Sequence, residues 1–142
     1  MRAAVLQNPS NQARCSLSDL EEAEIWYASA SETVISKGGR ERFTVAVAQS
    51  IHSLIKANDA LTMKYLGKRS SRHEEAAVLF GDLIKKGKIS PKFADLRKLL
   101  IRAAAEKSNY DYKGNEASEK TASSWLREVG KFLKVVHEIL GR

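Results

Sequence analysis

The chain has 142 residues, which is enough for one domain with a well-formed core and too few for two comfortable ones. With 43% hydrophobic and 29% charged residues, a single cysteine and no apolar run near the roughly twenty residues of a membrane span, it predicts neither a transmembrane helix nor a disulfide framework. A net charge of +7 favours acidic partners, and the lack of an apolar signal segment makes the cytoplasm the expected location.

The N-terminal half predicts an arm and two helices. Residues 1–15 show little periodicity, so we expect a loosely ordered arm before one domain over residues 16–142. Ser18 and Glu21 have capping-box spacing, which predicts a first helix that ends at Gly38-Gly39. The longest helical period follows in residues 42–67, with one apolar face formed by Val47, Ile51, Leu54, Ile55, Leu61 and Tyr65. Asn58 interrupts this face, so it either ties the helix to a neighbour or marks a site.

The C-terminal half predicts further helices. Ser71 and Glu74 open a third one, which Lys85-Lys86-Gly87 closes, and Ser90-Pro91 begins a fourth. A last helix runs from Ala122 to Leu140, and Gly130 within it permits the close approach of another helix. No segment alternates apolar and polar residues. The sequence therefore predicts an all-α fold, an antiparallel up-and-down four-helix bundle with an additional short helix.

The motifs of several enzyme classes are absent. The chain has no phosphate-binding glycine loop, dinucleotide fingerprint or HExxH motif, and no credible nucleophile–base pair, so we assign no catalytic residues. The three histidines (52, 73 and 137) lie on separate predicted helices without acidic residues at ligand spacing. We therefore assign no metal ligands and no cofactor, and a metal site would arise only where the fold happens to bring these residues together.

Two basic stretches are candidate anion-binding segments. Lys68-Arg69-Ser70-Ser71-Arg72-His73 precedes a predicted helix N-terminus, where cations and backbone amides suit a phosphate, although a solvated, capped turn explains it equally well. Tyr110 and Tyr112, beside Lys107 and Lys113, either stack on a base or anchor their turn by ring burial. The candidate RNA- or nucleotide-binding residues are Arg69, Arg72, His73, Arg102, Lys107 and Tyr112.

Several short strings carry a family resemblance. They are Ala46-Val47-Ala48 with Ile51-His52, Ala57-Asn58-Asp59-Ala60-Leu61, Leu66-Gly67-Lys68-Arg69-Ser70 with His73, and Lys107 with Tyr112 five residues later. Together they resemble the HEPN superfamily, and more narrowly its small bacterial and archaeal helical proteins, over roughly residues 20 to 140. The resemblance implies a helical bundle that often forms a dimer. It also implies either metal-independent ribonuclease activity or pairing with a small nucleotidyltransferase in a toxin–antitoxin-like system.

The chain departs from the R-x4–6-H motif of the HEPN ribonucleases. The window beyond Arg102 holds Lys107, Ser108 and Asn109 instead of a histidine. We therefore expect a non-catalytic partner or an RNA- or nucleotide-binding module that forms a homodimer. A divergent ribonuclease that uses Arg102, Lys107 and Tyr112 is the first alternative, and a protein–protein interaction bundle with no nucleic-acid role is the second.

Overall fold

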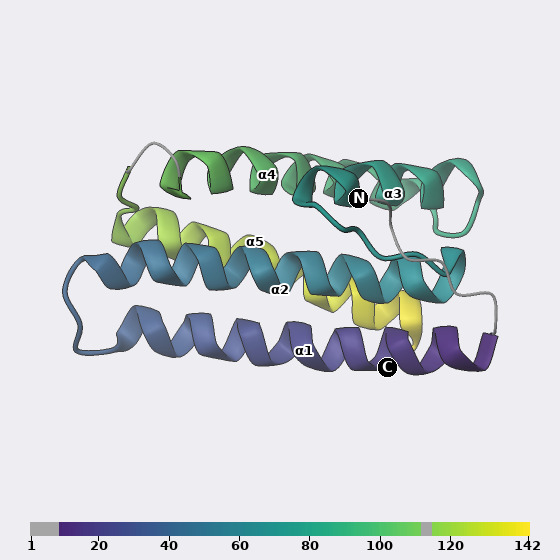
Figure 1. Ribbon diagram of the computed structural model, residues 1–142, viewed down its shortest axis with the longest axis horizontal. Coiled ribbons are helices and arrows are strands. Elements are labelled where there is room, and N and C mark those ends of the chain that lie inside the picture. The colour runs from purple at the N-terminus through teal and green to yellow at the C-terminus, as the bar shows by residue number, and fades with distance from the viewer. Residues whose placement is uncertain (1–8, 112–114) are drawn as a thin grey trace.

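The computed structural model describes residues 9–111 and 115–142 and contains only helices in these ranges (Figure 1). In chain order they are α1 (Pro9–Ile35), α2 (Glu41–Leu66), α3 (His73–Lys85), the short 3-10 helix η1 (Pro91–Leu96), α4 (Arg97–Asp111) and α5 (Glu119–Leu140). The prediction of an all-α bundle with an additional short helix is confirmed. Within the described residues, every helix is too short or too polar to cross a membrane.

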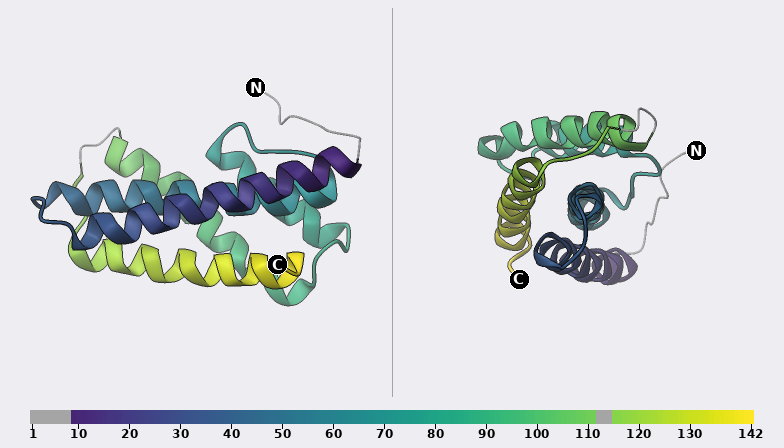
Figure 2. Two further views of the ribbon diagram at one scale, coloured as in Figure 1. Left: turned by 90° about the horizontal axis from the view of Figure 1, so that it is seen from below. Right: turned by 90° about the vertical axis from the view of Figure 1, so that its left-hand side faces the viewer.

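Helix α2 is the centre of the molecule and packs against each of the other α-helices. The end view in Figure 2 shows α1 along one side of α2, α5 along another, and α3 and α4 across a third. This arrangement follows from the sequence of α2, whose buried residues extend around most of the helix instead of forming one narrow stripe. Val47, Leu54 and Leu61 are almost fully buried, and Trp125 and Phe132 of α5 lie in the same core.

Helices α1 and α2 form an antiparallel hairpin (Figure 1). Their interface contains small polar residues. The Ser16 hydroxyl donates a hydrogen bond to the carbonyl of Ala60, and the Ser53 hydroxyl donates one to the carbonyl of Ala23, both at 2.6 Å. Ala23 and Ala60 are fully buried. Short side chains thus let the two backbones approach, and each buried hydroxyl has a partner on the opposite helix.

The start of the first helix differs from the prediction. Residues 9–15, which we expected in the arm, form the first turns of α1, whereas residues 1–8 lie outside the described residues. Proline suits the first turn of a helix because its missing N–H group would have no partner within the helix there. Ser18, the expected N-cap, is an exposed residue inside α1. The capping-box spacing of Ser18 and Glu21 therefore does not mark the start of this helix.

Other helix ends follow the sequence more closely. Gly67 ends α2 and Gly87 follows α3, both with φ of +67°. At the start of α3 the prediction is one residue off, because Glu75 instead of Glu74 reaches back to the backbone N–H groups of Ser71 and Arg72, at 3.1 and 3.2 Å. The expected fourth helix begins after Ser90, whose hydroxyl accepts a hydrogen bond from the Lys92 N–H at 3.3 Å, but its first turns form η1 before α4.

Two single-residue expectations are confirmed. The Asn58 side-chain amide donates to the carbonyl of Ala76 at 3.1 Å, so Asn58 ties α2 to α3. A Cβ atom on Gly130 would lie 2.7 Å from the hydroxyl of Tyr27, so this glycine permits α1 and α5 to approach closely.

The central position of α2 predicts a strong effect at Ile51, which is 4% exposed. Ile51→Asp should lower the free energy of unfolding by roughly 4 kcal/mol or prevent folding, because it buries an unpaired charge. Urea denaturation followed by circular dichroism measures this change. Val45→Asp is the control on the same helix, since Val45 is 49% exposed, and it should change stability by about 0.5 kcal/mol or less. Equal stability of the two variants would contradict the assigned faces.

Candidate functional site

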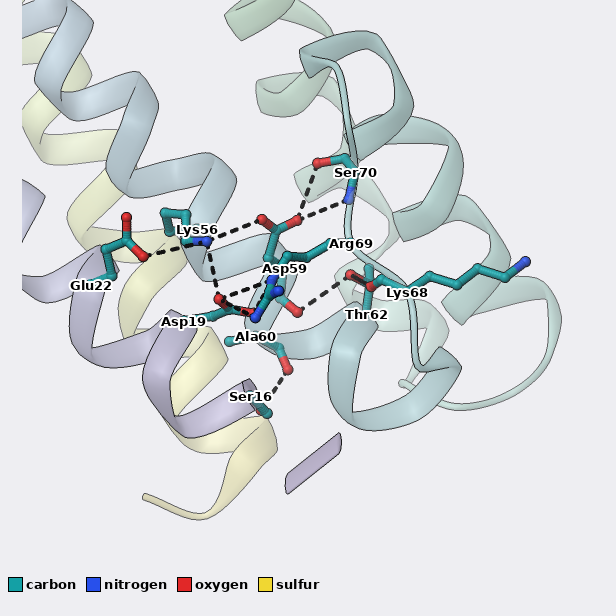
Figure 3. Close-up of polar contacts among 10 residues, drawn as sticks. All are labelled: Ser16, Asp19, Glu22, Lys56, Asp59, Ala60, Thr62, Lys68, Arg69 and Ser70. Carbon is teal, nitrogen blue, oxygen red and sulfur yellow. Dashed lines mark hydrogen bonds and ion pairs between the residues drawn. The ribbon is translucent and has the colours of Figure 1, made fainter. Parts of the chain in front are cut away.

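A cluster of charged side chains around two buried carboxylates joins α1, α2 and the segment between α2 and α3, residues 67–72. Asp19 comes from α1, Lys56 and Asp59 come from α2, and Arg69 comes from the connecting segment (Figure 3). Asp19 and Asp59 are 2% and 3% exposed. Charged groups at this depth require partners, so the geometry of the cluster determines whether its residues can contact a ligand.

Asp19 is the acceptor that the two cations share. Its carboxylate lies 3.0 Å from the Lys56 Nζ and 3.0 Å from one terminal nitrogen of Arg69. The Arg69 Nε also donates to both carboxylate oxygens, at 3.0 and 3.1 Å. Burial alone lowers the pKa of Lys56, but the hydrogen bond and charge of Asp19 together raise it above its usual value. Both cations are therefore held in the charged form by Asp19.

Asp59 binds the connecting segment through Ser70. One Asp59 oxygen accepts hydrogen bonds from the Ser70 N–H at 3.2 Å and from its hydroxyl at 3.1 Å, and the other lies 3.7 Å from the Lys56 Nζ. Burial raises the pKa of Asp59 to about 6, although the Ser70 hydrogen bonds and Lys56 act in the opposite direction. A second bond from α2 to the connecting segment comes from the Thr62 hydroxyl, which donates to the carbonyl of Lys68 at 2.7 Å.

The cluster therefore positions the connecting segment, and most of its charge is neutralised within the fold. Arg69 is one of the candidate ligand-binding residues, but its guanidinium is already bound to Asp19. Arg69 also borders a pocket of about 530 Å³ with Asn11, Arg14, Cys15 and Ser18. The other cation of that pocket, Arg14, donates to the side-chain oxygen of Asn11 at 2.5 Å. Both arginines of the pocket thus have partners within the protein.

The other residues of the basic turn lie at the start of α3. Arg72 is exposed at the N-cap position, next to the acidic residues of the first turn, Glu74 and Glu75. His73, the first residue of α3, lies against His52 of α2, with ring centres 6.1 Å apart. His52 stacks on Trp26 of α1 at 4.8 Å, with an angle of 22° between the ring planes. The two histidines lie on separate predicted helices and Trp26 is not among the residues predicted from the sequence, because only the tertiary fold brings the three rings together.

Arg102 lies on a different part of the molecule. Its guanidinium is 5.0 Å from the ring centre of Trp125, over which it lies, and the pair connects α4 with α5. Together with Lys120, Thr121 and Ser124 these residues line a pocket of about 230 Å³. Within the described part of the chain, neither Arg102 nor Lys120 has an ion-pair partner. The side chain of Lys107 and all of Tyr112 lie outside the described residues.

The start of α5, which forms one wall of this pocket, is held in place by hydrogen bonds. The Ala117 N–H donates to the Thr44 hydroxyl of α2 at 3.0 Å, which fixes the residues before α5. Ser118 caps the helix by accepting from the Thr121 N–H at 3.1 Å. Lys120 is not among the residues predicted from the sequence, since it belongs to neither of the basic stretches. Its proximity to Arg102 arises where the start of α5 meets α4 at the Arg102–Trp125 contact.

The comparisons with known proteins add no family assignment. No protein-family model and no curated protein matches this chain. The resemblance to the HEPN superfamily is therefore carried by the motifs of the sequence alone.

The raised pKa of Asp59 predicts that Asp59→Asn increases the free energy of unfolding at pH 7. The folded-state pKa of about 6 lies above the ordinary value of 3.8, so the stabilising contribution of Asp59 is present below pH 4 and is lost as the pH rises through 6. Asparagine keeps an oxygen that can accept the Ser70 hydrogen bonds. Relative to the wild type, the gain should reach up to about 3 kcal/mol at pH 7 and disappear near pH 4.

Urea denaturation of both proteins between pH 4 and pH 7 tests this prediction. Asp95→Asn is the matched control, because Asp95 is 92% exposed and its ion pair with Lys98 lies at the surface. A gain that is constant with pH, or that grows towards pH 4, would contradict the assigned role of Asp59.

A double-mutant cycle should show that Arg69 is a structural partner of Asp19. Arg69→Met and Asp19→Asn should each lower the free energy of unfolding by about 2–4 kcal/mol, because the first leaves the buried Asp19 with one partner fewer and the second removes the acceptor that Lys56 and Arg69 share. The double variant should lose about 1–3 kcal/mol less than the sum of the single losses. Arg40→Met is the control, since the Arg40–Glu116 pair is 86% and 63% exposed and should contribute below about 1 kcal/mol. Strictly additive losses would rule out this role of Arg69.

Proposed function

We propose that this protein is a HEPN-like helical bundle of the cytoplasm that binds RNA or a nucleotide without cleaving it. The observation that supports the proposal best is the pocket at Arg102 and Lys120, where two cations from different helices lie beside two hydroxyl-bearing residues and have no ion-pair partner among the described residues. The net charge of +7 adds long-range attraction for a polyanion.

The residues of the pocket suit a phosphate group. A guanidinium donates two parallel hydrogen bonds to phosphate oxygens, while an ammonium group acts as a compact charge. The Trp125 ring beneath Arg102 orients the guanidinium and leaves its N–H groups at the pocket. Trp125 itself is 1% exposed, so it has no free face on which a base could stack. The pocket therefore favours contacts with the phosphate backbone and predicts little preference for sequence.

Binding without cleavage is the favoured form of the proposal. Cleavage of RNA by general acid–base catalysis requires a group that titrates near neutrality, and histidine is the usual side chain in this role. The sequence beyond Arg102 lacks the histidine of the R-x4–6-H motif. A divergent ribonuclease that uses Arg102 remains the first alternative proposal, and the assay below distinguishes it by product formation.

The HEPN resemblance also leads us to propose a homodimer and a partner of the nucleotidyltransferase type. A second candidate function, a protein-interaction bundle without a nucleic-acid role, is favoured by exposed apolar residues on α3 and α4. Val78 and Ile101 are 57% and 49% exposed. Val78 also borders a pocket of about 330 Å³ between α3 and the η1–α4 segment, together with Gly81 and Ala94. Contiguous exposed apolar surface is a feature of protein-binding sites, and the second candidate requires that Val78 and Ile101 belong to one such surface.

The proposal predicts salt-sensitive binding of a short single-stranded RNA, measured by fluorescence anisotropy at 50 and 200 mM KCl. Arg102→Glu and Lys120→Glu should each weaken binding at least fivefold at the lower salt concentration. The slope of log K against log salt should also become shallower by about 0.7 for each phosphate that the variant no longer neutralises. Lys134→Glu on the exposed surface of α5 makes the same change in net charge and serves as the control.

The outcomes separate the three candidate functions. Equal losses of affinity in Lys134→Glu and in the pocket variants would show that net charge alone drives binding, against the proposed pocket. A lack of binding at 50 mM KCl would reject the RNA proposal and leave the protein-interaction bundle. Metal-independent cleavage of the RNA that Arg102→Ala abolishes would establish the ribonuclease instead.

A further inference from the structure

Two histidines that are distant in the sequence meet at the junction of α2 and α3. His52 lies on the exposed side of α2, and His73 is the first residue of α3. Their ring centres are 6.1 Å apart and their ring planes are at 82°. The connecting segment of residues 67–72 produces this proximity, because Asp59 and Asp19 hold Ser70 and Arg69 in place just before His73. The backbone just before His73 is thus anchored, which places this ring against His52.

The separation of the rings is close to that of two imidazoles bound to one metal ion. A zinc–imidazole bond measures about 2.0–2.1 Å and a ring nitrogen lies roughly 1.1 Å from the ring centre, so two imidazoles on one tetrahedral ion have ring centres about 5.2 Å apart. The observed 6.1 Å is larger than this by about 1 Å. Binding therefore requires side-chain rotations that bring the two rings closer by this amount and turn a nitrogen of each towards a common point.

We propose that His52 and His73 form a two-histidine site for a divalent transition metal ion of the zinc, nickel or copper type. Imidazole nitrogen is a preferred ligand of these ions, whereas magnesium and calcium prefer oxygen. The described residues contain no group of three or more histidine, cysteine or acidic side chains suited to one ion. The protein thus supplies two ligands, water completes the coordination, and the affinity is expected in the micromolar range.

Metal binding at this site would link the first residue of α3 to α2. The connecting segment already holds the two helices together through Ser70, and Asn58 does so through the Ala76 carbonyl. An ion that binds only the folded protein adds to its stability by mass action. The proposal is independent of RNA binding, because Arg102 and Lys120 lie on α4 and α5.

Trp26 provides a direct reporter, because its ring stacks on His52 at 4.8 Å. The chain has two tryptophans, and Trp125 is buried beside Arg102, so Trp125→Phe isolates the signal of Trp26. Nickel chloride, added to tag-free protein in a non-chelating buffer, should quench Trp26 fluorescence along a saturable curve. Isothermal titration of the same ion into the unaltered protein, which does not depend on Trp125→Phe, should give a stoichiometry near one ion per chain.

Three histidine variants test the assignment. His52→Ala and His73→Ala should each weaken nickel binding at least tenfold in the calorimeter, because each removes one of the two protein ligands. His137→Ala is the matched control and should bind as the unaltered protein does, since His137 lies on α5 beside Glu24 and the Arg142 carbonyl. Circular dichroism confirms that each variant is folded. Binding that is unchanged in His73→Ala, or quenching that does not saturate, would show that the two rings only pack against each other and would reject the site.

Discussion

The carboxylate of Asp19 is the interaction on which the rest of this structure depends. It is buried on α1, and it forms ion pairs with Lys56 of α2 and Arg69 of the connecting segment. Removing ions from water is costly, so such a cluster persists only when its members satisfy one another. Here they also join three segments of the chain at one point. The path of residues 67–72, and with it the start of α3, follows from this requirement.

The same interaction explains why two arginines that are both candidate ligand-binding residues in the sequence differ in whether their guanidinium groups can contact a ligand. Arg69 is engaged by a buried acid, whereas Arg102 lies over Trp125 and borders a pocket with Lys120. A count of positive charges cannot separate these two situations, because each depends on residues contributed by other helices. The proposed phosphate-binding pocket lies between α4 and α5, whereas Arg69 of the basic turn before α3 is bound to Asp19 and links this turn to α1.

Much of the fold could be predicted from the sequence, because apolar periodicity and glycine stops are local signals. The predicted central helix, Arg42 to Gly67, agrees with α2 within one residue at each end. The predicted last helix, Ala122 to Leu140, has the same end as α5 but begins three residues too late. The predicted start of the first helix at Ser18 is wrong, because residues with capping-box spacing occur inside helices as well as at their ends. Lys120 and Trp26 were missed for a different reason: their neighbours come from other helices, and no single-sequence pattern encodes such proximity.

The hydrogen bonds between α1 and α2 have a consequence for the order of folding. Ser16 and Ser53 donate hydrogen bonds to carbonyls of the partner helix that lie 44 and 30 residues away in the chain. The segment before α5 contacts α2 across a longer stretch, since the Ala117 N–H bonds to Thr44, 73 residues away. Because the entropy cost of closing a loop grows with its length, the α1–α2 hairpin can form before α5 covers it. The two hydroxyl hydrogen bonds would then set the register of α1 against α2 before α5 buries the rest of the shared core.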